Sequence, residues 1–71
     1  MNITSAQMQK ALTSNNNYSQ LGFSMMITRF KKNYERDPSN ETLQKCTDEA
    51  NAFIEKYKAI MAQDFEIISK L

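Results

Sequence analysis

The spacing of apolar residues predicts two amphipathic helices in the middle and at the end of the chain. Between residues 17 and 36, apolar positions recur every three or four residues and fall on one side of a helix. This stripe comprises Phe23, Met26, Ile27, Phe30 and Tyr34. From residue 38 to residue 70 a broader apolar face follows the same spacing. We therefore predict one helix over 17–36 and a longer, continuous one over 38–70.

A shorter helix is predicted over residues 4–13. Thr4 followed three residues later by Gln7 matches the capping box that starts many helices. Met8, Ala11 and Leu12 then share one face. A run of short polar residues over 13–17 ends this helix, because such side chains compete for the backbone hydrogen bonds.

The segment between the two longer helices predicts a tight turn. Asp37 suits a helix N-cap and Pro38 suits a first helical position, so almost no loop remains. So short a connection makes the two helices antiparallel neighbours, with Phe23 opposite Phe53. One Gly, one Pro and no Val argue against a sheet. The expected fold is all-α within a single small domain, 1–71: a short N-terminal helix and an antiparallel helical hairpin with a long C-terminal helix.

The end of the long helix is expected to extend past its partner in the hairpin, since 38–70 is much longer than 17–36. Either the first helix or another chain would cover this end. Asp64 lies among its apolar residues and must be paired, hydrogen-bonded or placed at an exposed helix end. Its suggested partners are Lys10, the 15–17 turn or an Arg of another chain. We predict self-association, as a dimer or higher oligomer, through a set of five residues: Met61, Asp64, Phe65, Ile68 and Leu71.

A second candidate surface lies on the helix over 17–36, away from its core stripe. It begins with apolar residues and continues as cations, and it comprises Tyr18, Leu21, Met25, Arg29, Lys32 and Arg36. Cations late in a helix also suit the helix dipole, which would explain them without a partner. As a binding face, the row fits a protein with an acidic surface. The alternative is a nucleotide or nucleic acid, with Tyr18 stacking on a base.

The residue types present exclude most catalytic chemistry. The chain has no His and a single Cys, so His-based catalysis, zinc clusters and internal disulfides are ruled out. Cys46 has no neighbouring base, and Asp48 and Glu49 would raise its pKa. No Gly-rich phosphate loop is present. We therefore expect no enzymatic activity, no catalytic or metal-binding residue and no cofactor.

Charge is distributed unevenly although the net charge is only +1. Residues 1–36 carry five cations and one acid, whereas 37–71 carry four cations and seven acids, so the halves have net charges of +4 and −3. This split favours packing of one half against the other, or contact between molecules. No apolar run has transmembrane length, the N-terminus lacks a signal-peptide pattern, and Cys46 suits a reducing compartment. We expect a cytoplasmic protein with no membrane partner.

Two short stretches resemble a known family. Asp37-Pro38-Ser39-Asn40 followed by Leu43, and the ending Ile67-Ile68-Ser69-Lys70-Leu71, resemble needle subunits of type III secretion systems. That resemblance implies a helical hairpin that polymerises, although the spacing from turn to terminus and the N-terminal half differ. In size and class the chain is also similar to small phage-encoded inhibitors. The sequence favours a small adaptor, regulator or inhibitor of that phage or mobile-element type, with a nucleic-acid binder or a structural subunit as alternatives.

Overall fold

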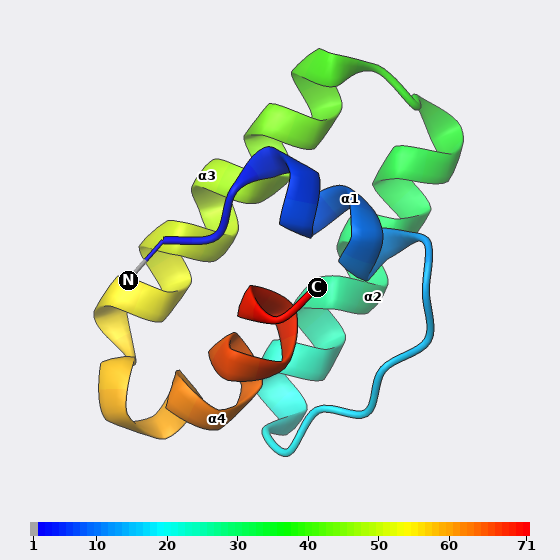
Figure 1. The fold of residues 1–71 in the computed structure, drawn as a ribbon. Helices are drawn as coiled ribbons and strands as arrows, with labels where there is room; N and C mark the ends of the chain where they lie inside the picture. The colour runs from blue at the N-terminus through cyan, green and yellow to red at the C-terminus, as the bar shows by residue number, and fades with distance from the viewer. Residues whose placement is uncertain (1) are drawn as a thin grey trace.

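The computed structural model describes residues 2–71 and contains four helices. They are α1 (Ser5–Leu12), α2 (Leu21–Arg36), α3 (Asn40–Lys56) and α4 (Lys58–Ser69). No strand occurs in this part of the chain. The prediction of an all-α fold is confirmed (Figure 1).

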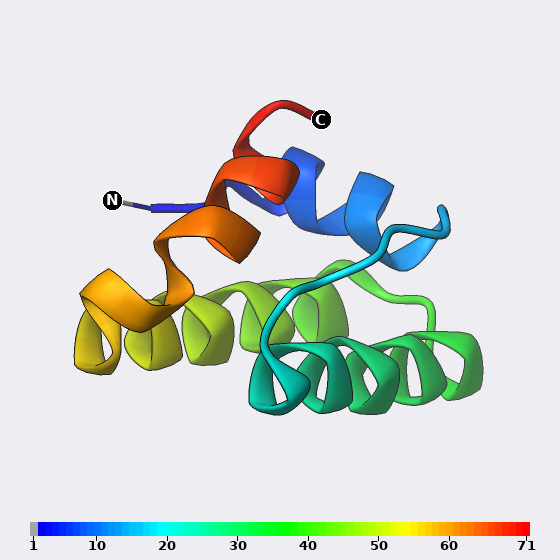
Figure 2. The ribbon, with the colours of Figure 1, turned by 90° about the horizontal axis from the view of Figure 1, so that it is seen from below.

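The helices form two layers. Figure 2 shows α2 and α3 side by side in one layer, with α1 and α4 together on one face of that pair. The predicted contact between Phe23 of α2 and Phe53 of α3 is confirmed, with ring centroids 6.4 Å apart. The opposite face of the α2–α3 pair is not covered by any helix, as Figure 2 shows.

The prediction of one continuous helix over 38–70 is wrong. The helix breaks at Tyr57, whose φ of −118° and ψ of 30° end α3 and begin α4. A straight helix of this length would span about 50 Å, whereas the longest dimension of the molecule is 31 Å. The bend brings α4 back over the other helices and buries Met61, Asp64 and Ile68. Burial of these side chains favours the bend, and Tyr57 keeps a backbone hydrogen bond to each helix: its N–H donates to the Phe53 carbonyl, and its carbonyl accepts from the Met61 N–H.

The helix predicted over 17–36 begins four residues late, at Leu21. Its expected first residues are not helical because the backbone N–H groups of Ser19 and Gln20 donate to the carboxylate of Asp64. Gln20 is the N-cap residue, but its own side chain caps nothing. A residue of α4 therefore sets the start of α2.

The other helix ends differ little from the predictions. The capping box of Thr4 and Gln7 is confirmed, and α1 covers all but the ends of the predicted 4–13. Asp37 is not the N-cap of α3, because Ser39 takes that place and accepts a hydrogen bond from the Thr42 N–H. The Asp37 carboxylate instead accepts from the Thr42 hydroxyl at 2.7 Å.

The core lies between the two layers. Its buried apolar residues come from all four helices and the N-terminal segment: Ile3, Met8, Ala11, Leu12, Phe23, Met26, Ile27, Phe30, Leu43, Cys46, Ala50, Ile54, Met61 and Ile68. At one end of the core, four aromatic rings form a chain of contacts in the order Tyr18, Phe23, Phe53 and Tyr57. These ring contacts connect the loop before α2 to the bend between α3 and α4.

Polar side chains hold both termini against the molecule. The side-chain amide of Asn51 accepts from the Ile3 N–H at 2.7 Å and donates to the Ile3 carbonyl at 3.0 Å. Gln7 donates to the carbonyl of Ser69, and Lys10 donates to the carbonyl of Leu71. α1 thus covers α4 within one chain. The predicted hairpin, with a long helix that extends past its partner, is not the observed fold.

Candidate functional site

Most of the predicted apolar and basic row lies together on the outer side of α2. Leu21 is 74% exposed and Met25 is 63% exposed, although both are large and apolar. Arg29, Lys32 and Arg36 follow them along the helix and are also exposed. These five residues, here called the outer row, lie opposite the buried stripe of α2 because of their helical spacing.

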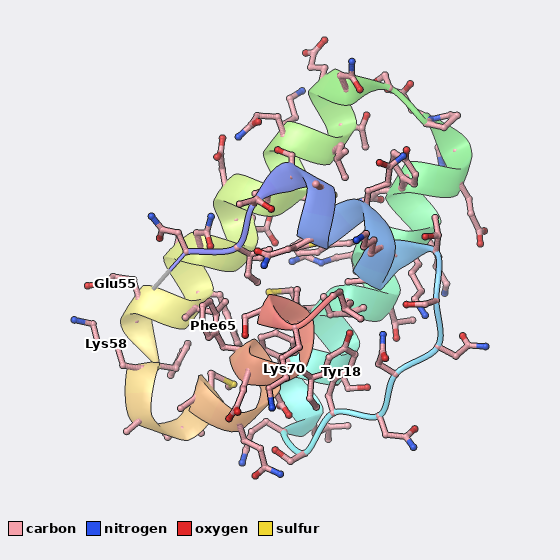
Figure 3. All side chains as sticks on the ribbon, viewed as in Figure 1. Tyr18, Glu55, Lys58, Phe65 and Lys70 are labelled. Carbon is pink, nitrogen blue, oxygen red and sulfur yellow. The ribbon has the colours of Figure 1, made fainter. Side chains whose placement is uncertain are left out.

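Tyr18 does not belong to the outer row. Its ring packs against Phe23, with centroids 5.1 Å apart, and is half-buried. Figure 3 shows Tyr18 and Phe65 within the outline of the molecule, whereas Glu55 and Lys58 lie at its edge. Within residues 2–71 the buried Tyr18 hydroxyl has no hydrogen-bond partner. Burial raises the pKa of Tyr18; the nearby Asn16 side chain lowers this pKa, and the charge of Asp64 raises it.

A shallow hollow of about 410 Å³ lies beside the apolar end of the outer row. Its lining consists of Gly22, Met25, Met26, Arg29 and Phe53. Gly22 has no side chain to cover the Phe53 ring, so the ring forms part of the surface of the hollow. From the sequence, Phe53 is expected on the core face, and Gly22 either allows close approach of a neighbouring backbone or is simply tolerated in the helix. The one sequence signal for the hollow is a glycine next to Leu21 in an apolar patch.

The cations of the outer row differ in their local partners. Arg29 forms an ion pair with Glu49 of α3 and stacks over the Phe30 ring at 5.3 Å. Lys32 and Arg36 have no carboxylate within ion-pair distance in the described chain. Lys31, next to them in sequence, points elsewhere and donates to the Ser14 carbonyl. The charges of Lys32 and Arg36, which lie further along α2 than the lining of the hollow, are therefore left to solvent or to a partner.

The five residues predicted for self-association do not lie on a helix end that extends past its partner. Met61, Asp64 and Ile68 are buried within the chain, and Phe65 and Leu71 are half-buried against the core. Asp64 is not at all exposed, and three donors bond it: the Ser19 N–H at 2.6 Å, the Ser19 hydroxyl at 2.9 Å and the Gln20 N–H at 2.9 Å. Of the suggested partners within the chain, neither Lys10 nor the 15–17 turn binds Asp64; Lys10 donates to the Leu71 carbonyl instead. On α4 the exposed large apolar residue is Ile60, at 57%.

The remaining titratable chemistry is sparse. Cys46 is buried between α2 and α3, and burial raises the pKa of its thiol. The charge of Glu49 raises this pKa further, and that of Arg29 lowers it. Within residues 2–71 no three His, Cys, Asp or Glu side chains come together as metal ligands. None of the four helices has both the length and the apolar character to cross a membrane.

Comparisons with known proteins give no relative. No family model matches the chain, and neither a curated protein nor a solved structure shows significant similarity to it. Arguments about function therefore rest on the chain's own surface.

Proposed function

We propose that this chain is a small non-catalytic protein that acts by binding another protein through the outer row of α2. The proposal rests on one observation: Leu21 is 74% exposed and Met25 is 63% exposed, next to an open hollow. Large apolar side chains grouped with a hollow and charged neighbours are typical of protein-binding surfaces. An adaptor, regulator or inhibitor requires no more than such a surface.

A catalytic role has less support from the residues. The one nucleophilic thiol, that of Cys46, is buried, and its raised pKa leaves less of the reactive thiolate. A role in binding nucleotides is also less supported. Tyr18, the aromatic residue that would stack on a base, packs on Phe23 instead.

Self-association is a second part of the proposal, through the surface of α4. Because Met61, Asp64 and Ile68 are buried in one chain, contact between folded copies would use Phe65, Leu71 and the exposed Ile60. Light scattering after size-exclusion chromatography, over a tenfold concentration range, tests this directly. A mass above that of the 8.2 kDa monomer that decreases in an Ile60→Ser variant supports the contact, and a constant monomer mass refutes it.

Affinity capture from lysate of the source organism, with quantitative mass spectrometry, tests the binding face. The double variant Leu21→Ser and Met25→Ser removes the apolar end of the outer row without touching the buried stripe. Ala6→Ser with Ala62→Ser is the matched control, because it also places two serines at exposed apolar positions, but on α1 and α4. We expect at least one protein to be captured by the wild type and the control and to be lost tenfold or more with the double variant. Equal capture by all three chains refutes the proposed face.

A further inference from the structure

The outer row is apolar at one end of α2 and positively charged at the other, and a binding partner must match this order. Its apolar members, Leu21 and Met25, lie in the first two turns, and its cations follow up to Arg36. The sixteen residues from Leu21 to Arg36 cover about 22 Å of helix axis from the first to the last. A matching partner carries apolar groups at one end of such a length and negative charge at the other.

The hollow indicates where the apolar end of the partner sits. Gly22 has no positive φ, and a Cβ built there would meet only the Phe53 Cζ, at an ordinary 3.7 Å. Neither the backbone nor the space around it therefore requires a glycine. What the glycine does is leave the Phe53 ring open to a side chain from outside, between α2 and α3. A helix laid along the line between two antiparallel helices inserts such side chains at intervals of three or four residues.

The charges of the outer row and of the chain's acids favour an acidic partner and disfavour a second copy of this chain. Among residues 2–71 Lys32 and Arg36 have no ion pair, and Arg29 is balanced by a single carboxylate. Three of the chain's exposed acids already pair with nearby cations: Glu41 and Glu66 with a Lys one turn along their own helices, and Glu55 of α3 with Lys58 at the start of α4. They would have to give up those partners to reach another copy's outer row.

We propose that the outer row and the hollow over Gly22 and Phe53 bind an amphipathic helix of another protein, with apolar residues at one end and acidic residues at the other. The inference rests on the proposed function, since it names the kind of partner for the same face. Apolar side chains of the helix enter the hollow, and its carboxylates face Lys32 and Arg36. The ion pairs orient the helix along α2, and the apolar contacts supply most of the affinity.

Selection from a displayed library of random 16-residue peptides, with the full-length chain as target, tests this inference. Selected peptides are then measured against three variants by fluorescence anisotropy. Gly22→Gln fills the hollow, and the pair Lys32→Gln with Arg36→Gln removes the free cations. Lys45→Gln with Lys58→Gln is the matched control, because it neutralises two exposed cations on α3 and α4. Far-UV circular dichroism and melting temperatures confirm that every variant is folded.

We expect the selected peptides to be rich in Glu and Asp and to become helical when bound. Their affinity should fall at least tenfold with Gly22→Gln and with the Lys32 and Arg36 pair, less than twofold with the control pair, and steadily with added salt. A different outcome is that the selected peptides lack acidic residues and bind with an affinity that falls with Gly22→Gln but not with the Lys32 and Arg36 pair. That result refutes the acidic partner and leaves the proposed face intact. If no peptide is selected, or binding ignores both changes, the face and the inference fail together. Binding of a 12-nucleotide single-stranded DNA that depends on Lys32 and Arg36, with no peptide selected, would identify a nucleic-acid surface instead.

Discussion

The Asp64 carboxylate in α4 accepts two hydrogen bonds from Ser19, one from its backbone N–H and one from its hydroxyl. A third comes from the N–H of Gln20, the N-cap residue of α2. A negative charge at the start of a helix satisfies free N–H groups and interacts favourably with the helix dipole. The buried acid that the sequence left unexplained is therefore a cap supplied from 45 residues away.

Replacement of Asp64 is expected to destabilise the fold. Asp64→Ala removes all three hydrogen bonds and should lower the free energy of unfolding by about 2–3 kcal/mol. Asp64→Asn keeps one acceptor but turns an amide NH₂ toward an N–H donor, so we expect a loss of about 1–2 kcal/mol. Urea denaturation followed by circular dichroism measures both. The control is Glu66→Gln on the exposed side of α4, which should change stability by less than about 0.5 kcal/mol; an equal effect of all three changes would contradict the capping role.

Asn51 is expected to be the main anchor of the N-terminal segment. Its amide makes both hydrogen bonds to the backbone of Ile3, whose side chain is buried. Asn51→Ala should cost about 1–2 kcal/mol, after the gain of roughly 0.5 kcal/mol that alanine brings to a helix. Asn33→Ala on the exposed side of α2 is the control. It brings the same gain in helix propensity without the loss of hydrogen bonds to Ile3, so the free energy of unfolding should stay equal or rise slightly. Hydrogen exchange at the Ile3 amide should accelerate in the first variant alone, and unchanged protection there would refute the anchor.

The sequence predicted those features that depend on local spacing. The capping box of Thr4 and the buried stripe of α2 are periodic or near-neighbour patterns, and both are confirmed. The break at Tyr57 has no local signal, because neither glycine nor proline is near and the apolar spacing continues through it. It results from burial of α4 against helices distant in sequence, which overrides local helix propensity. The bonds from Ser19 to Asp64 were missed for the same reason.

The outer row was predictable from the sequence only in part. Leu21, Met25 and the three cations lie on one side of a helix at any register, so helical spacing alone placed them together. Tyr18 was grouped with them because the helix was expected to begin at residue 17. Once α2 starts at Leu21, Tyr18 is in a loop and its ring turns toward Phe23. The hollow needed the packing of α2 against α3, which brings Phe53 next to Gly22.

Tyr18→Phe is expected to stabilise the protein. Within the described chain, residues 2–71, the buried Tyr18 hydroxyl has no hydrogen-bond partner, and removing it should raise the free energy of unfolding by about 1 kcal/mol. Tyr34→Phe is the contrasting control, because the Tyr34 hydroxyl accepts a hydrogen bond from Gln9 and its loss should lower stability slightly. Thermal and urea denaturation near neutral pH measure both changes. Destabilisation by Tyr18→Phe would mean that the hydroxyl is bonded after all.

The same variant has an expected signature at alkaline pH. Burial raises the pKa of Tyr18 in the folded chain above the ordinary value of 10.0. As the pH rises, the unfolded chain therefore loses the Tyr18 hydroxyl proton at a lower pH than the folded chain does. The wild-type free energy of unfolding keeps its full value with respect to this group below pH 10 and falls as the pH rises through the folded pKa. The stability advantage of Tyr18→Phe over the wild type should widen above pH 10 and stay constant between pH 6 and pH 9. Denaturation curves at matched pH values check this, and a constant difference across the whole range would contradict it.

Truncation after Ala62 is expected to unfold the chain, because the removed segment completes both the core and the start of α2. It contains Asp64, which caps α2, and Ile68, which is fully buried. Loss of an aliphatic core side chain alone costs about 2–5 kcal/mol, which is comparable to the whole stability expected of so small a domain. The shortened chain should show a weak helical signal and no cooperative melting by circular dichroism. Removal of Lys70 and Leu71 alone is the control. This deletion loses the hydrogen bond from Lys10 but retains the Ser69 carbonyl that accepts from Gln7, so the 1–69 chain should still melt cooperatively. A folded 1–62 fragment would instead show that α1, α2 and α3 form a stable core without α4, and that α4 is free to pack on another chain.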